Sequence, residues 1–575
     1  MAPDAIVVTG NGNITLNGEG NIGGLTSMNK AGEGTLAINT TNKYSGATVL
    51  HEGTIEFNSL KNGGEASAIG SSKEFAQNWI FDGGTYKYTG ATTATNRSAK
   101  LMRPTVFNIE KSSAVVTMNG SLEGNSDFIL DGKGQLKVGT TKFFTHTGAT
   151  QLNGGTLYLS TVDIAKAGIG SSSKLVLNGG HLKTKGESSG YETYSFPIEV
   201  IGDEISQISY NRNCYINNKV TGTGVLQFNI PYLREYIKGD FSEFTGRIIA
   251  NGISSESAGS LFLINSNSVN LKNTVIQCKG NARVCIWDTS GSQTLGGLSG
   301  VSGTYLSGSS KQTDGFSCTW SVGSANTDET FAGKINNWSC SGSGHSGTVS
   351  INKVGTGLWR LTGSNDYKGN TNVKAGTLVV NGTNSGTGPV AVSKDATLKG
   401  KGTIAARVSL LSGATVCAGD TLINSSVLKL NGGLTANYGS IIEFPLKSQD
   451  GMNASNRIKV TGAFTINDAT LSLDISNATS IQDGTQFTLF DLSAANVSGS
   501  GFANIVPEVP SENQVWDTSN LLTTGIISVK AKGADGINDA INDGSNDAPI
   551  YDLNGKRIPE AKGMYIRDGK KYFGK

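Results

Sequence analysis

The sequence predicts an all-β solenoid, in which short strands form coils that stack on one another. Three observations lead to this prediction. The chain is rich in glycine, with 78 Gly among 575 residues, and only 16% of its residues are charged; roughly 7% Gly and 25% charged residues are usual. Short segments alternate apolar with small or polar residues, and helical periodicity is nearly absent. These segments recur about every 20 residues, as the coils of a solenoid do.

Composition and charge exclude several classes of protein. The chain has only 10 Pro and no Gly at every third position, which excludes collagen. Its 47 basic and 45 acidic residues give a net charge of +2, so we expect no nucleic-acid partner. No stretch approaches the roughly 18 apolar residues of a membrane span, and residues 1–4 do not begin an export signal.

Each predicted strand follows a glycine turn. The clearest are residues 34–39 (GTLAIN), 53–58 (GTIEFN), 155–160 (GTLYLS) and 376–381 (GTLVVN). Because side chains alternate between the two faces of a strand, every second residue is expected to face the core. The residues expected to be buried are Leu36, Ile38, Leu157, Leu159, Leu378 and Val380.

A longer skeleton links these segments: an aromatic residue, any residue, Gly, any residue and Thr, followed by a second Gly-Thr. The aromatic position is Tyr44 in the first copy and Tyr367 in the third. His146 takes this position in the middle copy, so we expect it to have a structural role. Glycine at the corners permits backbone conformations with positive φ.

This skeleton resembles the autotransporter-associated β-strand repeat, also called the passenger-associated transport repeat. The closest copy runs through residues 353–363 (KVGTGLWRLTG), 367–369 (YKG) and 375–378 (AGTL). Related segments cover about 30–90, 130–185 and 350–500. The resemblance implies a right-handed parallel β-helix in a secreted or surface-displayed bacterial protein. It is nearly silent on biochemical activity.

The pattern divides the chain into five predicted regions. They are a β-helix with two repeat copies (1–185), an irregular β-helix section with insertions (186–345), a β-helix with the third copy and a C-terminal cap (346–530), a linker (531–548) and a small β tail (549–575). The tail has Asn-Gly and Asp-Gly hairpin signals. It resembles a shortened form of the C-terminal module of many secreted Bacteroidetes proteins.

No motif in the sequence predicts a metal site or a cofactor. The four histidines have no partners at metal-ligand spacing, and residues 18–23 match G-x-G-x-x-G without the helix that dinucleotide binding requires. The acidic segments 535–539 and 543–547 lack the order of a calcium loop. The six cysteines form no C-x-x-C pair, and we expect isolated buried thiols.

One aromatic and basic cluster stands out in the irregular section. It contains Tyr191, Tyr194, Tyr210, Arg212, Tyr215, Tyr232, Arg234, Tyr236 and Lys238. Aromatic faces and planar hydrogen-bonding groups suit sugars, and arginine suits carboxylates. The candidate carbohydrate-binding residues are Tyr232, Arg234, Tyr236, Lys238, Arg212 and Tyr210. If Tyr232, Arg234 and Tyr236 share an outward face they form a strip for an acidic polysaccharide; if they point inward they are core.

Two functions fit this sequence. The preferred hypothesis is non-enzymatic: a secreted or outer-surface β-helix that acts as an adhesin, a spacer or a carbohydrate-contacting module, with a polysaccharide or surface glycan as partner. The alternative is a β-helix polysaccharide lyase or glycoside hydrolase, or the non-catalytic stalk of one. Paired carboxylates on one face would favour hydrolysis.

Overall fold

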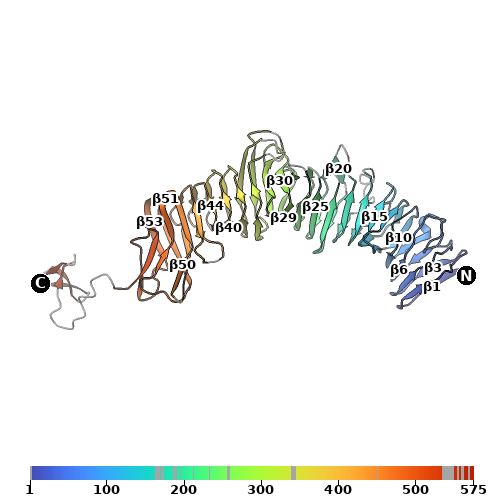
Figure 1. Ribbon diagram of the computed structural model, residues 1–575, viewed down its shortest axis with the longest axis horizontal. Coiled ribbons are helices and arrows are strands. Elements are labelled where there is room, and N and C mark those ends of the chain that lie inside the picture. The colour runs from blue at the N-terminus through green and yellow to red at the C-terminus, as the bar shows by residue number, and fades with distance from the viewer. Residues whose placement is uncertain are drawn as a thin grey trace. The chain divides into compact units, whose positions relative to one another are not determined.

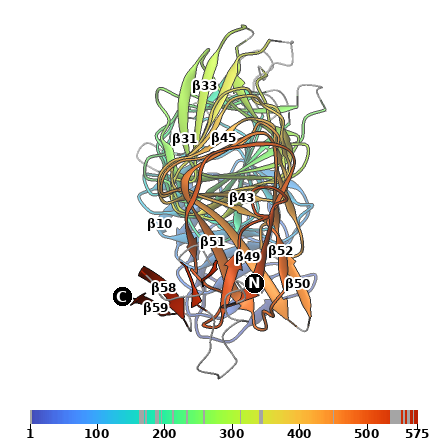
Figure 2. The same cartoon turned by 90° about the vertical axis from the view of Figure 1, so that its left-hand side faces the viewer.

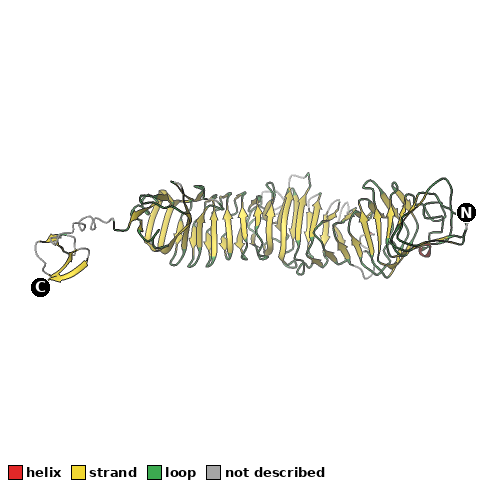
Figure 3. Cartoon of the chain, turned by 90° about the horizontal axis from the view of Figure 1, so that it is seen from below, coloured by secondary structure: helices red, strands yellow, loops and turns green. Residues whose placement is uncertain are grey.

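The computed structural model describes most of the chain. The described residues are 3–161, 163, 169, 174–185, 191–194, 196–210, 213–231, 234–255, 259–311, 313–338, 345–421, 423–449, 451–533, 550–552, 556–558, 563–567 and 570–574. They form two compact units, Met1–Leu378 and Val379–Lys575. Strands joined by short turns make up nearly all of both units (Figure 3).

The first unit stacks parallel strands in several sheets (Figure 1). One sheet runs β1 (Ala5–Val8), β3 (Ser27–Lys30), β5 (Thr48–Leu50), β7 (Trp79–Asp82), β10 (Ala99–Arg103) and β13 (Leu122–Gly124), with the short 3-10 turn η1 (Ala76–Asn78) leading into β7. A second runs β2 (Ile14–Leu16), β4 (Thr35–Ile38), β6 (Thr54–Phe57), β8 (Thr85–Tyr88), β11 (Thr105–Ile109), β14 (Phe128–Gly132), β16 (Thr150–Leu152), β18 (Leu175–Leu177), β21 (Ile198–Val200) and β24 (Val220–Gly222).

Two further groups of parallel strands complete this unit. One contains β9 (Thr93–Thr95), β12 (Val115–Met118), β15 (Gln135–Val138), β17 (Thr156–Leu159), β19 (His181–Thr184), β22 (Ile205–Ser209), β25 (Val225–Ile230), β27 (Arg247–Gly252), β29 (Leu271–Gly280), β31 (Gly291–Gly300), β33 (Ser317–Val322), β34 (Glu329–Phe331), β36 (Thr348–Lys353), β37 (Leu358–Leu361), β38 (Ser364–Asn365) and β39 (Thr371–Val373). The other, called here the β20–β35 sheet, contains β20 (Tyr191–Tyr194), β23 (Asn213–Ile216), β26 (Arg234–Ile237), β28 (Ser260–Ile264), β30 (Ala282–Ile286), β32 (Tyr305–Ser309) and β35 (Lys334–Ile335).

The second unit has the same architecture, and the boundary in the sequence falls within β40 (Gly376–Val380). Its strands are β41 (Thr383–Asn384), β42 (Val390–Val392), β43 (Ala396–Gly400), β44 (Thr403–Ile404), β45 (Val408–Leu410), β46 (Thr415–Ala418), β47 (Val427–Leu430), β48 (Leu434–Ala436), β49 (Ile441–Gln449), β50 (Met452–Ser455), β51 (Arg457–Ala478) and β53 (Phe490–Val506). Figure 2 shows β43, β49 and β51 from the end of this stack. An antiparallel sheet holds β52 (Gln486–Thr488), β54 (Gln514–Asp517) and β55 (Ile526–Ala531), and another holds β56 (Ile550–Tyr551), β57 (Arg557–Ile558), β58 (Gly563–Arg567) and β59 (Lys570–Gly574).

The predicted solenoid is confirmed as a parallel β-helix. Corresponding residues of successive coils pair in register, as Leu36 does with Ile55 and Ile55 with Tyr86. Each coil thereby covers the apolar face of the next, which one coil cannot do alone. The predicted core residues Leu36, Ile38, Leu157, Leu159, Leu378 and Val380 are all buried.

The aromatic position of the repeat has the same contact in all three copies. The Tyr44 and Tyr367 hydroxyls lie 2.8 and 2.7 Å from the hydroxyls of the threonines four residues later. His146 Nε2 lies 3.1 Å from Thr150 Oγ1, and its ring is fully buried. The predicted equivalence of His146 with the two tyrosines is therefore confirmed.

The close packing of coils requires both glycines of the skeleton, and backbone conformation gives a second reason at one of them. A Cβ atom on Gly46 would lie 2.4 Å from the Thr26 carbonyl oxygen, so the close approach of neighbouring coils leaves no room for a side chain. Gly53 also has a φ of +72°, a conformation that side chains disfavour, and a Cβ atom there would lie 2.3 Å from the Gly32 carbonyl oxygen.

A buried lysine closes a corner in the first and third copies. Lys30 Nζ donates to the carbonyls of Ala31 and Gly32 and, at 3.4 Å, to Glu52. Lys353 Nζ donates to the equivalent three carbonyls, those of Val354, Gly355 and Ala375, at 2.8, 2.8 and 3.1 Å. Burial lowers the pKa of both amines, to about 8 for Lys353. The corner lysine thus supplies hydrogen-bond donors to backbone carbonyls at the corner between strands.

Replacing His146 by tyrosine is expected to preserve the fold and to reduce its acid sensitivity. Burial lowers the pKa of His146 to about 4, whereas an unfolded imidazole titrates near 6.5. Between these values the unfolded chain binds a proton that the folded chain does not, so stability falls as the pH decreases from 6.5 to 4. Denaturant titrations at pH 7 and pH 4.5 should show a smaller loss for His146→Tyr than for the wild type. An equal loss would contradict the buried, neutral ring.

Candidate functional site

The structure describes part of the predicted carbohydrate-binding cluster. Arg212 and Tyr232 lie outside the described residues, and the structure describes the backbone of Arg234 in β26 but not its side chain. Tyr210 follows β22, outside the β20–β35 sheet, and is only 2% exposed. Tyr236 lies in β26, is 4% exposed, and is followed by the half-buried Lys238.

Tyr236 lies on the outer face of the β20–β35 sheet. Its neighbour Ile237 pairs with Ile264, which pairs with Ile286, and these isoleucines are fully buried. On the same inward side, Phe262 of β28 packs against Phe228 of β25, with ring centroids 5.9 Å apart. Because successive side chains alternate, Tyr236 points away from this core. It is nevertheless buried, because other side chains cover it.

Three aromatic rings cover one another on this outer face. Tyr215, Tyr236, Leu263 and Cys285 occupy corresponding positions in four successive strands. The ring centroids of Tyr215 and Tyr236 are 4.8 Å apart, and those of Tyr236 and Trp287 are 3.6 Å apart. Tyr215 and Trp287 remain half-buried, so part of this aromatic surface is accessible.

Two lysines add positive charge to the aromatic rings. Lys238 Nζ lies 4.1 Å from the Tyr215 ring centroid and 4.7 Å from that of Trp287. Lys311 Nζ lies 5.5 Å from the Trp287 ring. Such contacts hold an ammonium group over the electron-rich ring face. We call Tyr215, Tyr236, Lys238, Trp287 and Lys311 the Trp287 cluster.

A parallel row of residues extends the cationic character of the sheet. Arg234, Leu261, Arg283, Tyr305 and Lys334 occupy corresponding positions of β26, β28, β30, β32 and β35. The Arg283 guanidinium carbon lies 4.2 Å from the Tyr305 ring. Lys334 pairs with Asp366 at 2.6 Å and lies 5.7 Å from the ring of Trp338, which is 53% exposed.

The candidate residues predicted from the sequence do not include Trp287, Arg283, Tyr305 and Lys311. One signal could have found part of this set: Arg283, Cys285 and Trp287 alternate along one strand and its end, as Arg234, Tyr236 and Lys238 do. The sequence does not show that these two segments lie on the same sheet face. They do not pair directly, because β28 lies between them, and the register of each strand with β28 cannot be read from the sequence.

Cysteine chemistry differs from the expectation of isolated thiols at one position. Cys285, on the outer face beside the Trp287 cluster, is disulfide-bonded. Cys278, Cys318 and Cys417 are free and buried, as expected. Burial raises the pKa of the Cys278 and Cys417 thiols to about 12, so they are poor nucleophiles.

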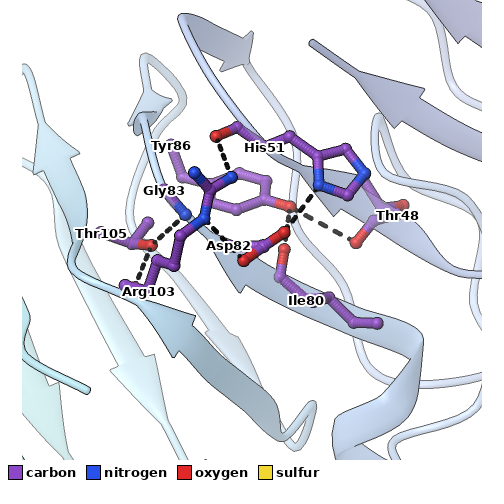
Figure 4. A network of polar contacts seen from close by, with 8 residues as sticks. All are labelled: Thr48, His51, Ile80, Asp82, Gly83, Tyr86, Arg103 and Thr105. Carbon is purple, nitrogen blue, oxygen red and sulfur yellow. Dashed lines mark hydrogen bonds and ion pairs between the residues drawn. The ribbon is translucent and has the colours of Figure 1, made fainter.

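A second polar network joins three strands near the beginning of the chain (Figure 4). His51 Nδ1 lies 2.7 Å from Asp82 Oδ2, and Arg103 Nε donates to Asp82 Oδ1 at 2.9 Å. Arg103 also donates to the His51 carbonyl at 2.9 Å. Partial burial opposes ionisation of Asp82, but the hydrogen bonds from Arg103 and His51 outweigh it and lower its pKa.

The contacts of this network join neighbouring coils, which indicates a structural role. Arg103 shares the Asp82 carboxylate with His51, so the negative charge is neutralised by a guanidinium instead of serving the imidazole alone. The His-Asp pair of a hydrolase requires an activated nucleophile at the other imidazole nitrogen. Tyr86, the other ionisable side chain drawn in Figure 4, instead donates its hydroxyl to the Ile80 carbonyl at 2.9 Å.

Within the described ranges, the structure contains no group of three or more His, Cys, Asp or Glu residues that could hold a metal ion. Across those same ranges, no helix is long and apolar enough to cross a membrane.

The comparison with protein families identifies the repeat. The family model of the passenger-associated transport repeat matches residues 28–57 and 351–380. Both matched segments contain the buried corner lysine and the tyrosine-threonine contact. The chain carries passenger-associated transport repeats. The middle copy, with His146, lies outside the matched residues but has the same contact.

A curated protein is similar to part of this repeat-bearing chain. The adhesin BmaC autotransporter of Brucella suis biovar 1 (strain 1330) is 28% identical over 236 residues. The similar region covers 38% of this chain and 7% of the adhesin. The similarity therefore concerns a small part of a much longer protein.

Proposed function

We propose that this chain is a secreted or surface-displayed β-helical adhesin that contacts acidic glycans through the Trp287 cluster. One observation carries the proposal: half-buried aromatic rings and two ammonium groups gather on the outer face of a β-helix built from passenger-associated transport repeats. Aromatic faces pack against sugar rings, and cationic groups attract carboxylates. The remaining coils serve as a spacer.

Two further observations support an extracellular role. The similar protein from Brucella is named an autotransporter adhesin. In addition, Cys285 is disulfide-bonded. Disulfides form and persist mainly in oxidising compartments such as the periplasm and the cell exterior.

Removing the central ring of the cluster is expected to weaken glycan binding. The experiment measures binding of polygalacturonate and hyaluronate by calorimetry in low salt, for the wild type and for Trp287→Ala. We expect about a tenfold loss of affinity, because the substitution removes both the stacking surface and the cation-π partner of two lysines. Binding should also weaken with added salt, since exposed charges are screened.

Tyr438→Ala is the matched control, because Tyr438 is 73% exposed and lies in the second unit. This variant should bind like the wild type. Wild-type protein that binds neither polymer, or Trp287→Ala protein that binds with undiminished affinity, would contradict the proposal. Release of unsaturated or reducing ends from a bound polymer would instead support the enzymatic alternative.

A further inference from the structure

The second unit contains a polar pocket that is separate in sequence from the Trp287 cluster. It has a volume of about 540 Å³ and lies over the outer faces of β43, β46, β49 and β51. Its size falls within the range of small-ligand sites, roughly 300–1,000 Å³. The lining residues that matter here are Lys399, Asp420, Glu443, Lys447, Asp474 and Asn477.

Strand register brings the charged residues to one face. Lys399 pairs with Cys417, which pairs with Glu443, so these three side chains form one outward row. Pro445 pairs with Asp474 and Lys447 with Asn477, which places two further rows beside the first. The intervening residues Ile442, Phe444 and Leu446 are fully buried in the core. The pocket floor is therefore fixed by the sheet.

Hydrogen bonds also fix the wall of the pocket. Lys399 Nζ donates to the Asp420 carbonyl at 2.9 Å, and Asn381 Nδ2 donates to Asp420 Oδ2 at 2.8 Å. Asn456 Oδ1 accepts from the backbone N–H groups of Asn424 and Ser426 at 3.2 and 3.1 Å. These contacts hold Asp420, Asn424 and Ser426, which follow β46, beside the residues of the pocket.

Three charged side chains in the pocket take part in no ion pair with a described residue: Glu443, Lys447 and Asp474. One oxygen of Asp474 accepts the Ser476 N–H at 3.0 Å. Glu443 also lies beside the buried Cys417 thiol, where its charge helps to raise the thiol pKa. The pocket therefore offers carboxylate acceptors and an ammonium donor that the protein itself does not pair with one another.

The composition of the lining selects a class of ligand. The described lining residues include no aromatic ring, and the polar surface of the pocket exceeds its apolar surface, which disfavours a purely apolar ligand. Its two lysines and three acidic residues give a net charge of −1, which disfavours an anion. Interspersed carboxylates, amides and an ammonium group match the hydroxyl groups of a sugar, each of which both donates and accepts.

We propose that this pocket binds a non-anionic saccharide, with Glu443 and Asp474 accepting hydrogen bonds from its hydroxyl groups and Lys447 donating to an oxygen. This site is distinct from the proposed glycan surface at the Trp287 cluster, which is cationic. The two sites would therefore prefer sugars of different charge.

The test measures binding of cellotriose, maltotriose and chitotriose by saturation-transfer NMR and calorimetry, with trigalacturonate as the anionic comparison. Wild-type protein should bind at least one of the three neutral sugars. The Glu443→Gln and Asp474→Asn variants should each bind it at least tenfold more weakly, because a charged acceptor is lost. Their melting temperatures should not fall, since neither carboxylate takes part in a described ion pair.

Trp287→Ala is the matched control, and its binding of the neutral sugar should be unchanged. Unchanged binding would show that the neutral sugar does not bind at the Trp287 cluster, so the two proposed sites can be tested separately. Asn477→Ala changes only an exposed lining side chain and should also weaken binding, which keeps the test decisive if a carboxylate variant does not fold. The proposal is overturned if wild-type protein binds none of the neutral sugars at 10 mM, or if all three pocket variants bind with wild-type affinity.

Discussion

Replacing Trp359 by alanine is expected to lower the free energy of unfolding by about 3–5 kcal/mol, as removal of a large buried side chain usually does. Trp359 is 1% exposed, and its indole Nε1 donates to the Leu298 carbonyl at 2.9 Å. It lies in β37, which pairs with β34, and Leu298 lies in β31 beyond that strand. The ring therefore ties three successive strands together. Guanidinium denaturation followed by circular dichroism measures the loss.

Trp338 provides the matched control for this substitution. It is 53% exposed, and removal of an exposed side chain usually changes stability by less than about 0.5 kcal/mol. Trp338→Ala should therefore unfold at nearly the wild-type denaturant concentration. A loss below about 1 kcal/mol for Trp359→Ala would mean that the core of the third repeat copy is not packed as described.

The second large effect is expected at the corner lysine. Lys353→Met removes the donor to three carbonyls, and each buried group left without a partner costs about 1–3 kcal/mol. Part of this loss is offset, because the variant no longer buries an ammonium group. We expect a net destabilisation of about 2 kcal/mol or more at pH 7.

The destabilisation caused by Lys353→Met should grow as the pH rises. Burial lowers the pKa of Lys353 to about 8 in the folded chain, whereas an unfolded lysine titrates near 10.4. Between these values the unfolded chain keeps a proton that the folded chain has lost, so the wild type gains stability with increasing pH. The difference in unfolding free energy between wild type and Lys353→Met should therefore increase from pH 8 to pH 10.

Lys374→Met is the control for the lysine prediction, because Lys374 is exposed on the next coil, directly after the residue that pairs with Lys353. This variant should differ little from the wild type at any pH. If Lys353→Met is as stable as Lys374→Met, the three carbonyls find other partners and the corner lysine is not required. A difference from the wild type that does not change with pH would contradict the lowered pKa.

The coil and its repeat could be predicted from the order of the residues alone. Alternation such as that of Leu36 and Ile38 specifies which face of a strand is buried, and this information is local. The positions of Tyr44, His146 and Tyr367 also followed from local order, since each side chain bonds to a threonine four residues later. The requirement for glycine at Gly53 is local only in part: its positive φ is a local property, whereas the close approach of the Gly32 carbonyl oxygen comes from the neighbouring coil.

The residues that share the outer surface could not be predicted in this way, because they are brought together by the pairing of strands. The sequence placed Tyr236 on a face with Arg234, yet it could not show that Tyr215 and Trp287 would cover the ring. The pocket in the second unit arose in the same way, from the pairing of Cys417 with Glu443 and of Pro445 with Asp474. The coils differ in length, so the register between them depends on how each turn packs and not on a fixed sequence spacing. Local pattern therefore specifies the inside of this β-helix, whereas the arrangement of its candidate binding surfaces depends on contacts between residues far apart in the chain.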